Sequence, residues 1–395
     1  MPKMQKINCF FSILIVLNVS AQKVSVSLYN DFDLTSVVVS LNEGSYRVYC
    51  DKTYQFTLDT DHVIYITRTN DQISLRDSKG HIGMFSKVLF RGTGNANSFK
   101  IRPVNPLIGE RKYDDELEIR IDLNRLLILN WVDMDNYIAT VVETEGGHKA
   151  IIEYYKTQSI ITRTYTYDHL ERHIGEGFCL CDGVHCQAYK GREKRNSLIL
   201  KATKQTTGLV ITDKNQELIT AAFHANCGGE TANSGDVWLL NKPYLQTVKD
   251  TYCLYARNAR WKRTFSLHEW SNYLKKNDFP VDGFHVSLFA FDQPTRKKNY
   301  IWMNRAIPFI KIRDDWKLRS SFFSVRVEGN HIILDGKGYG HGVGLCQEGA
   351  MEMALKGKTY QEIIDFYYQD VKNFHINQIK ALEESKLLSN PFDDL

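Results

Sequence analysis

The first hundred residues alternate between hydrophobic and polar positions at the spacing of short β-strands. Segments such as KVSVSLYN, SVVVSL and HVIYITR are rich in β-branched residues and are separated by turn residues. The same pattern continues through ELEIRIDLNRLLILNWV, which indicates a hairpin that turns at DLN. We therefore expect residues 22–111 to form a β-rich N-terminal region.

The period changes to that of helices after Asp133. DMDNYIATVVETEGG begins with aspartates that can cap a helix and ends at a glycine pair, and KAIIEYYKTQSIITRTYTYDHLERH predicts a longer helix. A β-rich stretch is expected at residues 197–225, a helix at LHEWSNYLKKN, a hairpin at SSFFSVRVEGNHIILDGK, and helices at CQEGAMEMALKG and TYQEIIDFYYQDV. The expected fold class is α+β, with a mixed helix and strand domain at 112–375, a polar insertion at about 254–310 and a polar tail at 376–395.

The N-terminus has the features of a secretory signal peptide. Two lysines precede the apolar run at residues 7–17, and the small residues VSA end at Ala21. No later segment approaches eighteen uninterrupted apolar residues, so we expect no transmembrane anchor after cleavage. The pattern predicts removal of residues 1–21 and an exported protein of the periplasm or cell envelope.

The charge and composition of the chain exclude one class of function, strong nucleic-acid binding, and little else. The formal net charge of +4 is too small for a strongly basic nucleic-acid-binding protein. The aromatic fraction of 12% suits sugar binding, but aromatic residues buried in β-structure account for it equally well.

Cysteines and histidines crowd into the stretch HIGEGFCLCDGVHCQAYKG. His173, Cys181, His185 and Cys186 could close a tetrahedral zinc site, with Cys179 as the alternative to Cys181. A disulfide from Cys179 or Cys181 to Cys186, with His173 on the surface, is the other interpretation in an exported protein.

Glu145 is the candidate acid. It ends the helix that begins near Asp133 and precedes two glycines. A carboxylic acid at the apolar end of a helix, near its negative pole, has its ionised form disfavoured and is suited to donate a proton. An ordinary solvent-exposed glutamate is the plainer alternative, and Glu143 is the neighbouring competitor.

Two glycine-rich stretches are further candidates for binding. GKGYGHGVGLCQEGA has glycines at alternate positions, as in an extended strand whose bare face packs closely against backbone or a ligand. It lacks the Lys-Ser/Thr pair of a phosphate loop and the strand–helix setting of a dinucleotide site. HANCGGETANSGDVW is expected to be a polar loop that either binds a ligand or merely turns.

Six of these blocks occur in the order, and nearly the spacing, of a known family. They are DMDNYIATVVETE, EYYKTQSIITRTYTY, CDGVHCQAYKG, HANCGGETANSGDVW, PYLQTVKD and GKGYGHGVGLCQEGAMEMALKGKTYQEIIDFYY. From about Lys112 to Gln369 the chain resembles the SpoIID/LytB family. It departs from the family pattern at Gly146, where the family usually has methionine.

The resemblance implies an exported peptidoglycan lytic transglycosylase. Such an enzyme cleaves the bond between N-acetylmuramic acid and N-acetylglucosamine in peptide-stripped glycan strands and leaves 1,6-anhydro products, here with Glu145 as the single general acid and base. It also implies a structural Zn²⁺ held by His173, Cys181, His185 and Cys186. The residues that it implies for glycan binding are Lys156, Gln158, Arg163, Gln187, Tyr189, His224, Asn226, Ser234, His341 and Gln347.

A second function remains open at this stage. Some members of the family enhance an N-acetylmuramoyl-L-alanine amidase, so a non-catalytic wall-binding module is the alternative. The expected partners are then glycan strands and a cell-wall amidase, and no nucleic acid.

Overall fold

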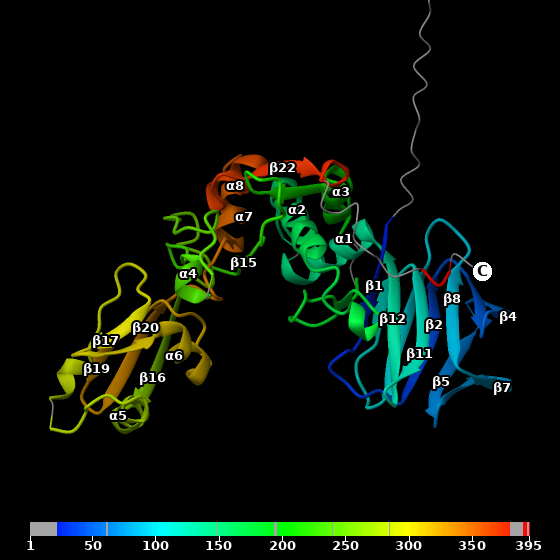
Figure 1. Ribbon diagram of the computed structural model, residues 1–395, viewed down its shortest axis with the longest axis horizontal. Coiled ribbons are helices and arrows are strands. Elements are labelled where there is room, and N and C mark those ends of the chain that lie inside the picture. Colours follow the sequence, from blue (N-terminus) through cyan, green and yellow to red (C-terminus); the bar gives the residue numbers. More distant parts are fainter. Residues whose placement is uncertain are drawn as a thin grey trace, which may run out of the picture.

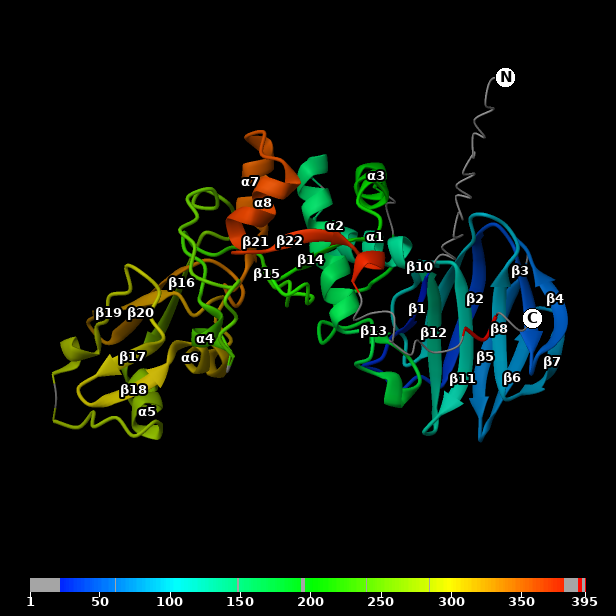
Figure 2. The same cartoon turned by 45° about the horizontal axis from the view of Figure 1, so that its top comes forward.

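The molecule is elongated and has three parts. A computed structural model describes residues 22–60, 62–147, 149–192, 196–238, 240–283, 285–379, 390–392 and 395. A β-sandwich lies at one end, helices form the middle, and a smaller lobe of strands and helices lies at the other end (Figures 1 and 2). The β-rich N-terminal part and the mixed remainder confirm the α+β class.

The N-terminal strands form two sheets that share one hydrophobic core. The seven-stranded sheet has the order β13-β1-β12-β11-β8-β3-β4. Its strands are β1 (Lys23–Ser27), β3 (Tyr46–Cys50), β4 (Thr53–Leu58), β8 (Lys87–Gly92), β11 (Glu116–Asp122), β12 (Arg125–Asp133) and β13 (Leu180–Cys181). The six-stranded sheet has the order β10-β9-β2-β5-β6-β7. Its strands are β2 (Ser36–Glu43), β5 (Val63–Thr69), β6 (Gln72–Asp77), β7 (Gly80–Phe85), β9 (Ser98–Asn105) and β10 (Arg111–Asp114).

The alternation seen in the sequence sets which side chains enter this core. In β5, Ile64 and Ile66 are buried while Tyr65 between them is exposed, as the period of two requires. The expected hairpin is β11–β12, which turns at Leu123 and Asn124 with positive φ at both residues. These two strands carry the sandwich past residue 111, so the chain passes from sheet to helix only at Asp133.

The central part is built around two helices that follow the sandwich directly. The Asp133 side chain accepts hydrogen bonds from the backbone N–H groups of Asp135 and Asn136 and so caps α1. The central elements are α1 (Met134–Glu145), α2 (Ile152–Asp168), η1 (Ile174–Glu176), α3 (Ser197–Gln205), β14 (Leu209–Thr212), β15 (Phe223–His224), α4 (Ser234–Val237), β21 (Leu345–Cys346), α7 (Gln347–Leu355), α8 (Tyr360–Tyr367), β22 (Lys372–His375) and η3 (Ile376–Gln378).

The expectation of β-structure from residue 197 was wrong for the helix α3. The Asn196 side chain accepts from the backbone N–H of Leu198, and Ile199, Ala202 and Thr203 are buried at helical spacing. The Thr203 hydroxyl lies 3.0 Å from that of Ser159 on α2. Packing of this stripe against α2 overrides the strand preference of the short apolar run. β-structure begins only at β14.

The small lobe has its own hydrophobic core, which includes Phe265, Trp270, Phe309 and Phe323. Its elements are β16 (Arg260–Ser266), α5 (Leu267–Lys276), η2 (Val286–Phe289), β17 (Asn299–Trp302), β18 (Arg305–Pro308), α6 (Phe309–Trp316), β19 (Phe323–Glu328) and β20 (His331–Lys337). It reaches beyond the expected insertion at 254–310 because β16 needs β20 as its hydrogen-bonded neighbour.

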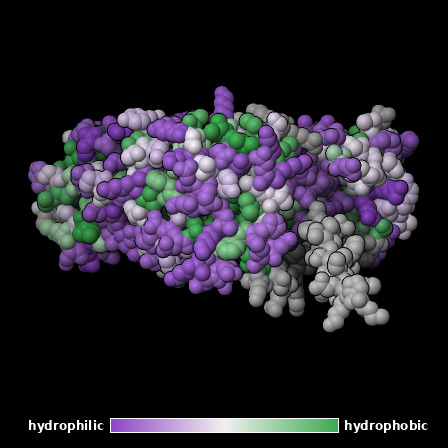
Figure 3. All heavy atoms as spheres, turned by 90° about the horizontal axis from the view of Figure 1, so that it is seen from above, coloured by the Kyte–Doolittle hydropathy of each residue, from purple (hydrophilic) through white to green (hydrophobic). Residues whose placement is uncertain are grey.

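The surface is mostly polar. Figure 3 shows a face on which hydrophilic residues dominate and hydrophobic ones gather only in small groups. None of the helices among the described residues is both long enough and apolar enough to cross a membrane.

Candidate active site

Glu145 stands at the C-terminal end of α1, where the chain turns at Gly146 and Gly147. Its Oε1 accepts a hydrogen bond from the backbone N–H of Ala188 at 3.0 Å. Its backbone carbonyl accepts from Nε2 of Gln347, the first residue of α7, at 3.1 Å. Segments far apart in the sequence therefore hold both ends of this residue.

Burial raises the pKa of the Glu145 carboxyl above its usual value, and the Ala188 N–H opposes that rise only in part. The carboxyl consequently keeps its proton to a higher pH than an exposed glutamate would. The neighbouring Glu143 is placed differently, since it is buried and accepts from the backbone N–H of Asn196 at 3.3 Å. Of the two glutamates, only Glu145 faces the cavity described next.

A cavity of about 490 Å³ opens in front of Glu145. Its wall is largely apolar and aromatic, with a few polar groups, as in many sites for small ligands. Among the described residues that line it, Glu145 is the only carboxylate. The lining consists of Glu145, Tyr165, His169, Val184, Cys186, Gln187, Thr220, Ala221, Ala222, Phe223, Trp238 and His341.

The aromatic side chains of the wall are fixed by their neighbours. The Tyr165 ring stacks on His169 with centroids 4.0 Å apart, and the Tyr165 hydroxyl accepts from Arg172 at 3.0 Å. Trp238 lies against His341 with ring centroids 5.6 Å apart. Flat rings held in this way offer a surface on which the apolar face of a sugar can pack.

His341 belongs to this wall, and both nitrogens of its ring form hydrogen bonds. Its Nε2 donates to the carbonyl of Phe223 at 2.9 Å, and its Nδ1 accepts from the N–H of Val343 at 3.0 Å. Burial lowers the pKa of the imidazole to about 4. The ring is therefore neutral at ordinary pH, and it shapes the cavity rather than carrying charge into it.

Three of the residues expected to bind glycan lie at or beside the cavity. Gln187 and His341 line it, and Gln347 contacts the backbone of Glu145. The Gln187 side chain accepts a hydrogen bond from the Thr166 hydroxyl at 3.0 Å, and this bond fixes the orientation of its amide at the cavity wall.

Four other expected residues, on α2 and in the loop after Gln187, lie away from this cavity. Lys156 pairs with Glu153 at 2.7 Å, and Arg163 is buried and binds Asp135 at 2.8 Å. The Tyr189 hydroxyl donates to Asn130 at 2.6 Å in the sandwich, and Gln158 is fully buried. The bonds of Lys156, Arg163 and Tyr189 hold α2 and the following loop to their neighbours.

The residues expected to bind from the polar loop are also internal. Nδ1 of His224 donates to the carbonyl of Val343 at 3.1 Å. Asn226 bonds to Glu348 at 2.6 Å, and the Ser234 hydroxyl accepts from the N–H of Lys242 at 2.8 Å. All three are buried, and none lines the cavity in front of Glu145. These three side chains therefore form hydrogen bonds inside the protein and do not face the cavity.

The alternating glycines do not form the extended strand that we expected. β20 ends at Lys337, and the glycines that follow it have positive φ values of 77°, 107°, 85° and 70° at Gly338, Gly340, Gly342 and Gly344. A Cβ atom would lie 2.5 Å from the carbonyl oxygen of Asn226 at Gly338 and 2.8 Å from the Cβ of His224 at Gly340. The bare positions thus face protein rather than sugar, because this segment packs directly on the backbone around β15.

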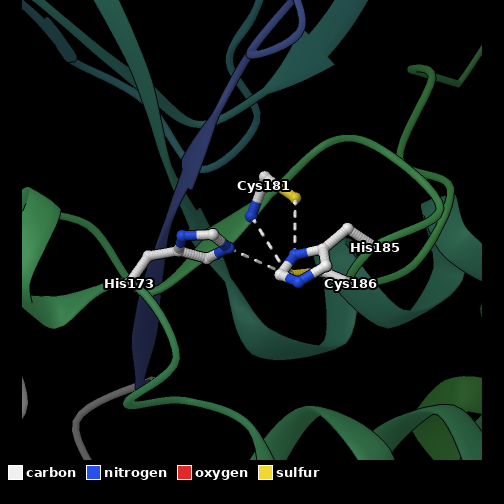
Figure 4. Close-up of side chains that lie close together, drawn as sticks. All are labelled: His173, Cys181, His185 and Cys186. Carbon is white, nitrogen blue, oxygen red and sulfur yellow. Dashed lines mark hydrogen bonds between the residues drawn. The ribbon is translucent and has the colours of Figure 1, made fainter.

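The histidines and cysteines of the candidate zinc site lie together (Figure 4). Nε2 of His173 is 3.5 Å from the Cys186 sulfur, and Nδ1 of His185 is 3.9 Å from the Cys181 sulfur. One donor atom from each of the four residues lies within 4.8 Å of the others. Two thiolates and two imidazoles in this arrangement fit a tetrahedral Zn²⁺.

Two surrounding features suit the same ion. Nδ1 of His173 lies 2.5 Å from a carboxylate oxygen of Glu176, which turns Nε2 toward the sulfurs, as outer carboxylates do for metal-bound histidines. Cys181 is placed by β13, which pairs with β1 in parallel. Cys179 instead accepts from the Ser25 hydroxyl at 3.4 Å and lies outside the group of four.

Several wall residues were not expected from the sequence. Tyr165 and Trp238 lie inside the blocks TRTYTY and SGDVW, but nothing local distinguishes them from aromatic core residues. Thr220, Ala221 and Ala222 reach the cavity through their place before β15. Only the pairing of β15 with β21 brings this segment opposite α1.

The candidate site combines a cavity, in which Glu145 is the one carboxylic acid among the described lining residues, with a neighbouring group of two histidines and two cysteines. Known proteins of similar sequence indicate the class to which this arrangement belongs. Residues 123–212 match the sequence model of the family described as "Stage II sporulation protein". The chain is 27% identical over 255 residues to Stage II sporulation protein D of Bacillus subtilis, covering 60% of this chain and 73% of the relative.

Two further relatives extend the match. An uncharacterized protein of Brachyspira hyodysenteriae is 29% identical over 279 residues, covering 67% of this chain and 73% of the relative. The amidase enhancer of Bacillus subtilis is 26% identical over 284 residues, covering 58% of this chain but 39% of the relative. These matches agree with the resemblance to the SpoIID/LytB family that the sequence blocks indicated, and they support a function connected with the bacterial cell wall.

Proposed function

We propose that this protein is a lytic transglycosylase that cleaves peptidoglycan glycan strands, with Glu145 as its single acid and base. The observation that carries the proposal is a carboxyl with a raised pKa at the wall of an aromatic-lined cavity. Among the described residues, no second carboxylate lines that cavity. Most glycoside hydrolases need two carboxyl groups, whereas an intramolecular transfer can use one.

The chemistry follows from the two protonation states of one side chain. The protonated Glu145 carboxyl donates to the glycosidic oxygen as the bond between N-acetylmuramic acid and N-acetylglucosamine breaks. The resulting carboxylate then accepts the proton of the muramic 6-hydroxyl, whose oxygen bonds to the anomeric carbon and closes the 1,6-anhydro ring. The proton thus returns to Glu145, and no water is consumed. The Ala188 N–H holds the carboxyl in place through both steps.

The proposed zinc has a structural part in this scheme. His173, Cys181, His185 and Cys186 would hold Zn²⁺ with four protein ligands, which leaves no position for substrate. Cys186 also lines the cavity, and the next two residues carry the amide of Gln187 and the N–H that binds Glu145. A rigid Cys186 therefore helps to position both groups.

The decisive experiment compares Glu145→Gln with Glu143→Gln. Glutamine keeps the size of the side chain and an acceptor for the Ala188 N–H but cannot donate an acidic proton. We expect release of 1,6-anhydromuramyl products from amidase-treated glycan strands to fall roughly 10²–10⁴-fold in Glu145→Gln. Glu143→Gln should stay close to the wild type because Glu143 does not face the cavity. Undiminished product release by Glu145→Gln would reject the assignment.

A non-catalytic amidase enhancer is the second candidate function. Two observations favour it. The chain is similar to a protein named amidase enhancer, and most of the polar residues that the family resemblance implied for glycan binding are buried in contacts within the protein. In this case the wild type would release no anhydro products, yet it would raise the rate of a separate cell-wall amidase. Glu145→Gln would leave that stimulation unchanged.

A further inference from the structure

A second group of metal-binding side chains lies in the part of the chain between the central helices and the small lobe. Its members are Cys227, Asp250, Cys253 and Cys346, and each is fully buried. They come from three separate segments, namely the loop after β15, the segment before β16 and the start of α7. It shares no residue with the His/Cys group around Cys186.

The donor atoms of this group are spaced for one ion. One donor atom from each residue lies within 4.8 Å of all the others. The Cys227 sulfur is 3.3 Å from the Cys253 sulfur and 3.2 Å from Oδ2 of Asp250. Zinc–sulfur bonds of about 2.3 Å place two sulfurs of a tetrahedral site about 3.8 Å apart. The observed spacing is close to that value and well above the roughly 2.05 Å of a disulfide bond.

The side chain of Asp250 is placed to bind a cation. It is fully buried, and among the described residues no lysine, arginine or histidine forms an ion pair with it. Oδ2 accepts from the Tyr367 hydroxyl and Oδ1 from the N–H of Tyr252, at 2.9 and 2.8 Å. These bonds orient the carboxylate, but they do not supply the charge that a buried anion requires.

The sulfur of Cys346 is held in position by backbone donors. It accepts from the backbone N–H groups of Cys227 and Gly349 at 3.3 and 3.4 Å. Cys346 caps the N-terminus of α7, where the helix dipole stabilises negative charge. Donors of this kind around a metal ligand fix its direction and its charge state.

A nearby guanidinium offsets part of the remaining negative charge. Three thiolates and one carboxylate exceed the charge of a single divalent ion. Arg296 donates to the carbonyl oxygens of Cys227 and Glu230 at 2.8 and 2.6 Å, which brings its positive charge next to the group. The loop that carries Arg296 belongs to the small lobe.

We propose that Cys227, Asp250, Cys253 and Cys346 bind a second, structural Zn²⁺. Thiolate-rich tetrahedral donor sets select this ion over hard cations such as Mg²⁺ or Ca²⁺. The ion joins the segment that leaves the central part for β16 to the segment that returns from β20, and so fastens the base of the small lobe (Figure 1). This inference does not depend on the proposed glycan cleavage.

The test is the zinc content of the full-length mature protein, purified with its native metal and measured by inductively coupled plasma mass spectrometry. We expect Cys346→Ser to contain about one zinc fewer per chain than the wild type. Cys50→Ser is the matched control, because Cys50 is a buried cysteine of β3 outside both groups. Equal zinc in Cys346→Ser and the wild type overturns the proposal. A Cys227–Cys253 disulfide, found by peptide mapping of the wild type without reductant, overturns it equally.

A second variant covers the case in which Cys346→Ser does not fold. Asp250→Asn keeps the shape of the side chain and removes one anionic ligand. We expect its dissociation constant for this zinc, measured by competition with a chromogenic chelator, to rise at least tenfold over that of the wild type. An unchanged dissociation constant, with the same total zinc, contradicts the site.

Discussion

Glu145 and His341 face the same cavity, and burial disfavours the charged form of both side chains. Removal from water disfavours the charged form of either group, so the pKa of the acid rises and that of the imidazole falls. The cavity therefore presents a carboxyl that keeps its proton to a higher pH than an exposed glutamate, beside an imidazole that is uncharged near neutral pH.

The lowered pKa of His341 predicts a loss of stability in mild acid. Between about pH 6.5, where an unfolded histidine titrates, and about pH 4, the unfolded chain binds a proton that the folded chain does not. The free energy of unfolding should therefore fall as the pH drops through this window. A pKa difference of this size corresponds to at most roughly 3 kcal/mol, and partial exposure of the ring reduces the expected loss to about 1–2 kcal/mol.

The measurement is urea unfolding at several pH values for the wild type and His341→Gln. Glutamine can donate to the Phe223 carbonyl and accept from the Val343 N–H, but it does not titrate. We expect a flatter dependence on pH for His341→Gln. The exposed His331, replaced in the same way, is the control, and identical curves for all three proteins would show that His341 contributes nothing.

At the scale of elements, the glycine-rich segment after β20 works by close packing. Its backbone lies against the residues around β15, and this contact carries the parallel pairing of β15 with β21. α7, with Gln347 at its start, follows directly. The segment thus positions one of the two contacts that hold Glu145 at the cavity.

Comparing Gly344→Ala with Gly357→Ala separates the stability cost of lost packing space from the cost of a left-handed backbone conformation. Gly344 and Gly357 both have positive φ, at 70° and 83°, but a Cβ atom meets the Ala222 carbonyl at Gly344 and open space at Gly357. Gly357→Ala should cost about 1 kcal/mol for the left-handed conformation. Gly344→Ala should cost roughly 1–3 kcal/mol more, because the added atom forces the backbone apart. Equal losses in urea unfolding would mean that the segment is not tightly packed.

The loop around Cys186 offers a second prediction at this scale. Cys186→Ala removes one of the four proposed zinc ligands, so we expect purified protein to contain about one zinc fewer per chain than the wild type. Cys179→Ala should keep the full amount because Cys179 bonds to Ser25 instead. The measurement is elemental analysis of both variants. A zinc loss in Cys179→Ala as well as in Cys186→Ala would make Cys179 a ligand, and full zinc in Cys186→Ala would contradict the site.

At the scale of the whole molecule, the sandwich, the central helices and the small lobe meet at the two groups of cysteines. β13 ties the His/Cys loop to the edge of the sandwich, while the second group lies where the small lobe joins the centre. The cavity in front of Glu145 lies in the central part, between α1 and the segment that leads into β15. The sandwich and the central part share one hydrophobic core, whereas the small lobe has its own, so the placement of the lobe depends more on the segments that join it to the centre.

The expected export of the protein is tested at its N-terminus. Residues 1–21 lie outside the described part of the chain, and the next residue, Gln22, is anchored by Tyr167, whose hydroxyl donates to its side chain at 2.7 Å. We expect N-terminal sequencing of the protein recovered from the cell envelope or medium to begin at Gln22. Recovery only from the cytoplasm, with Met1 retained, would contradict export.

The sequence alone was enough to predict those features that depend on neighbours along the chain. The strand pattern of the sandwich, the helix that ends at Glu145 and the crowding of residues 173–186 are local, because caps, periods and ligand spacing act over a few residues. The resemblance to the SpoIID/LytB family was recognised from sequence blocks of the same local kind. The prediction for the α3 region was wrong because a short apolar run fits both a strand and a helix until its packing partner is known.

Only the tertiary structure decided which residues meet across long distances. The pairing of β15 with β21 brings residues 220–223 and His341 opposite α1, and it turns the glycines toward backbone instead of sugar. The same fold gathers Cys227, Asp250, Cys253 and Cys346 although more than a hundred residues separate the first from the last. No local pattern carries this information, because strand pairing is set by the burial and hydrogen bonding of the whole chain.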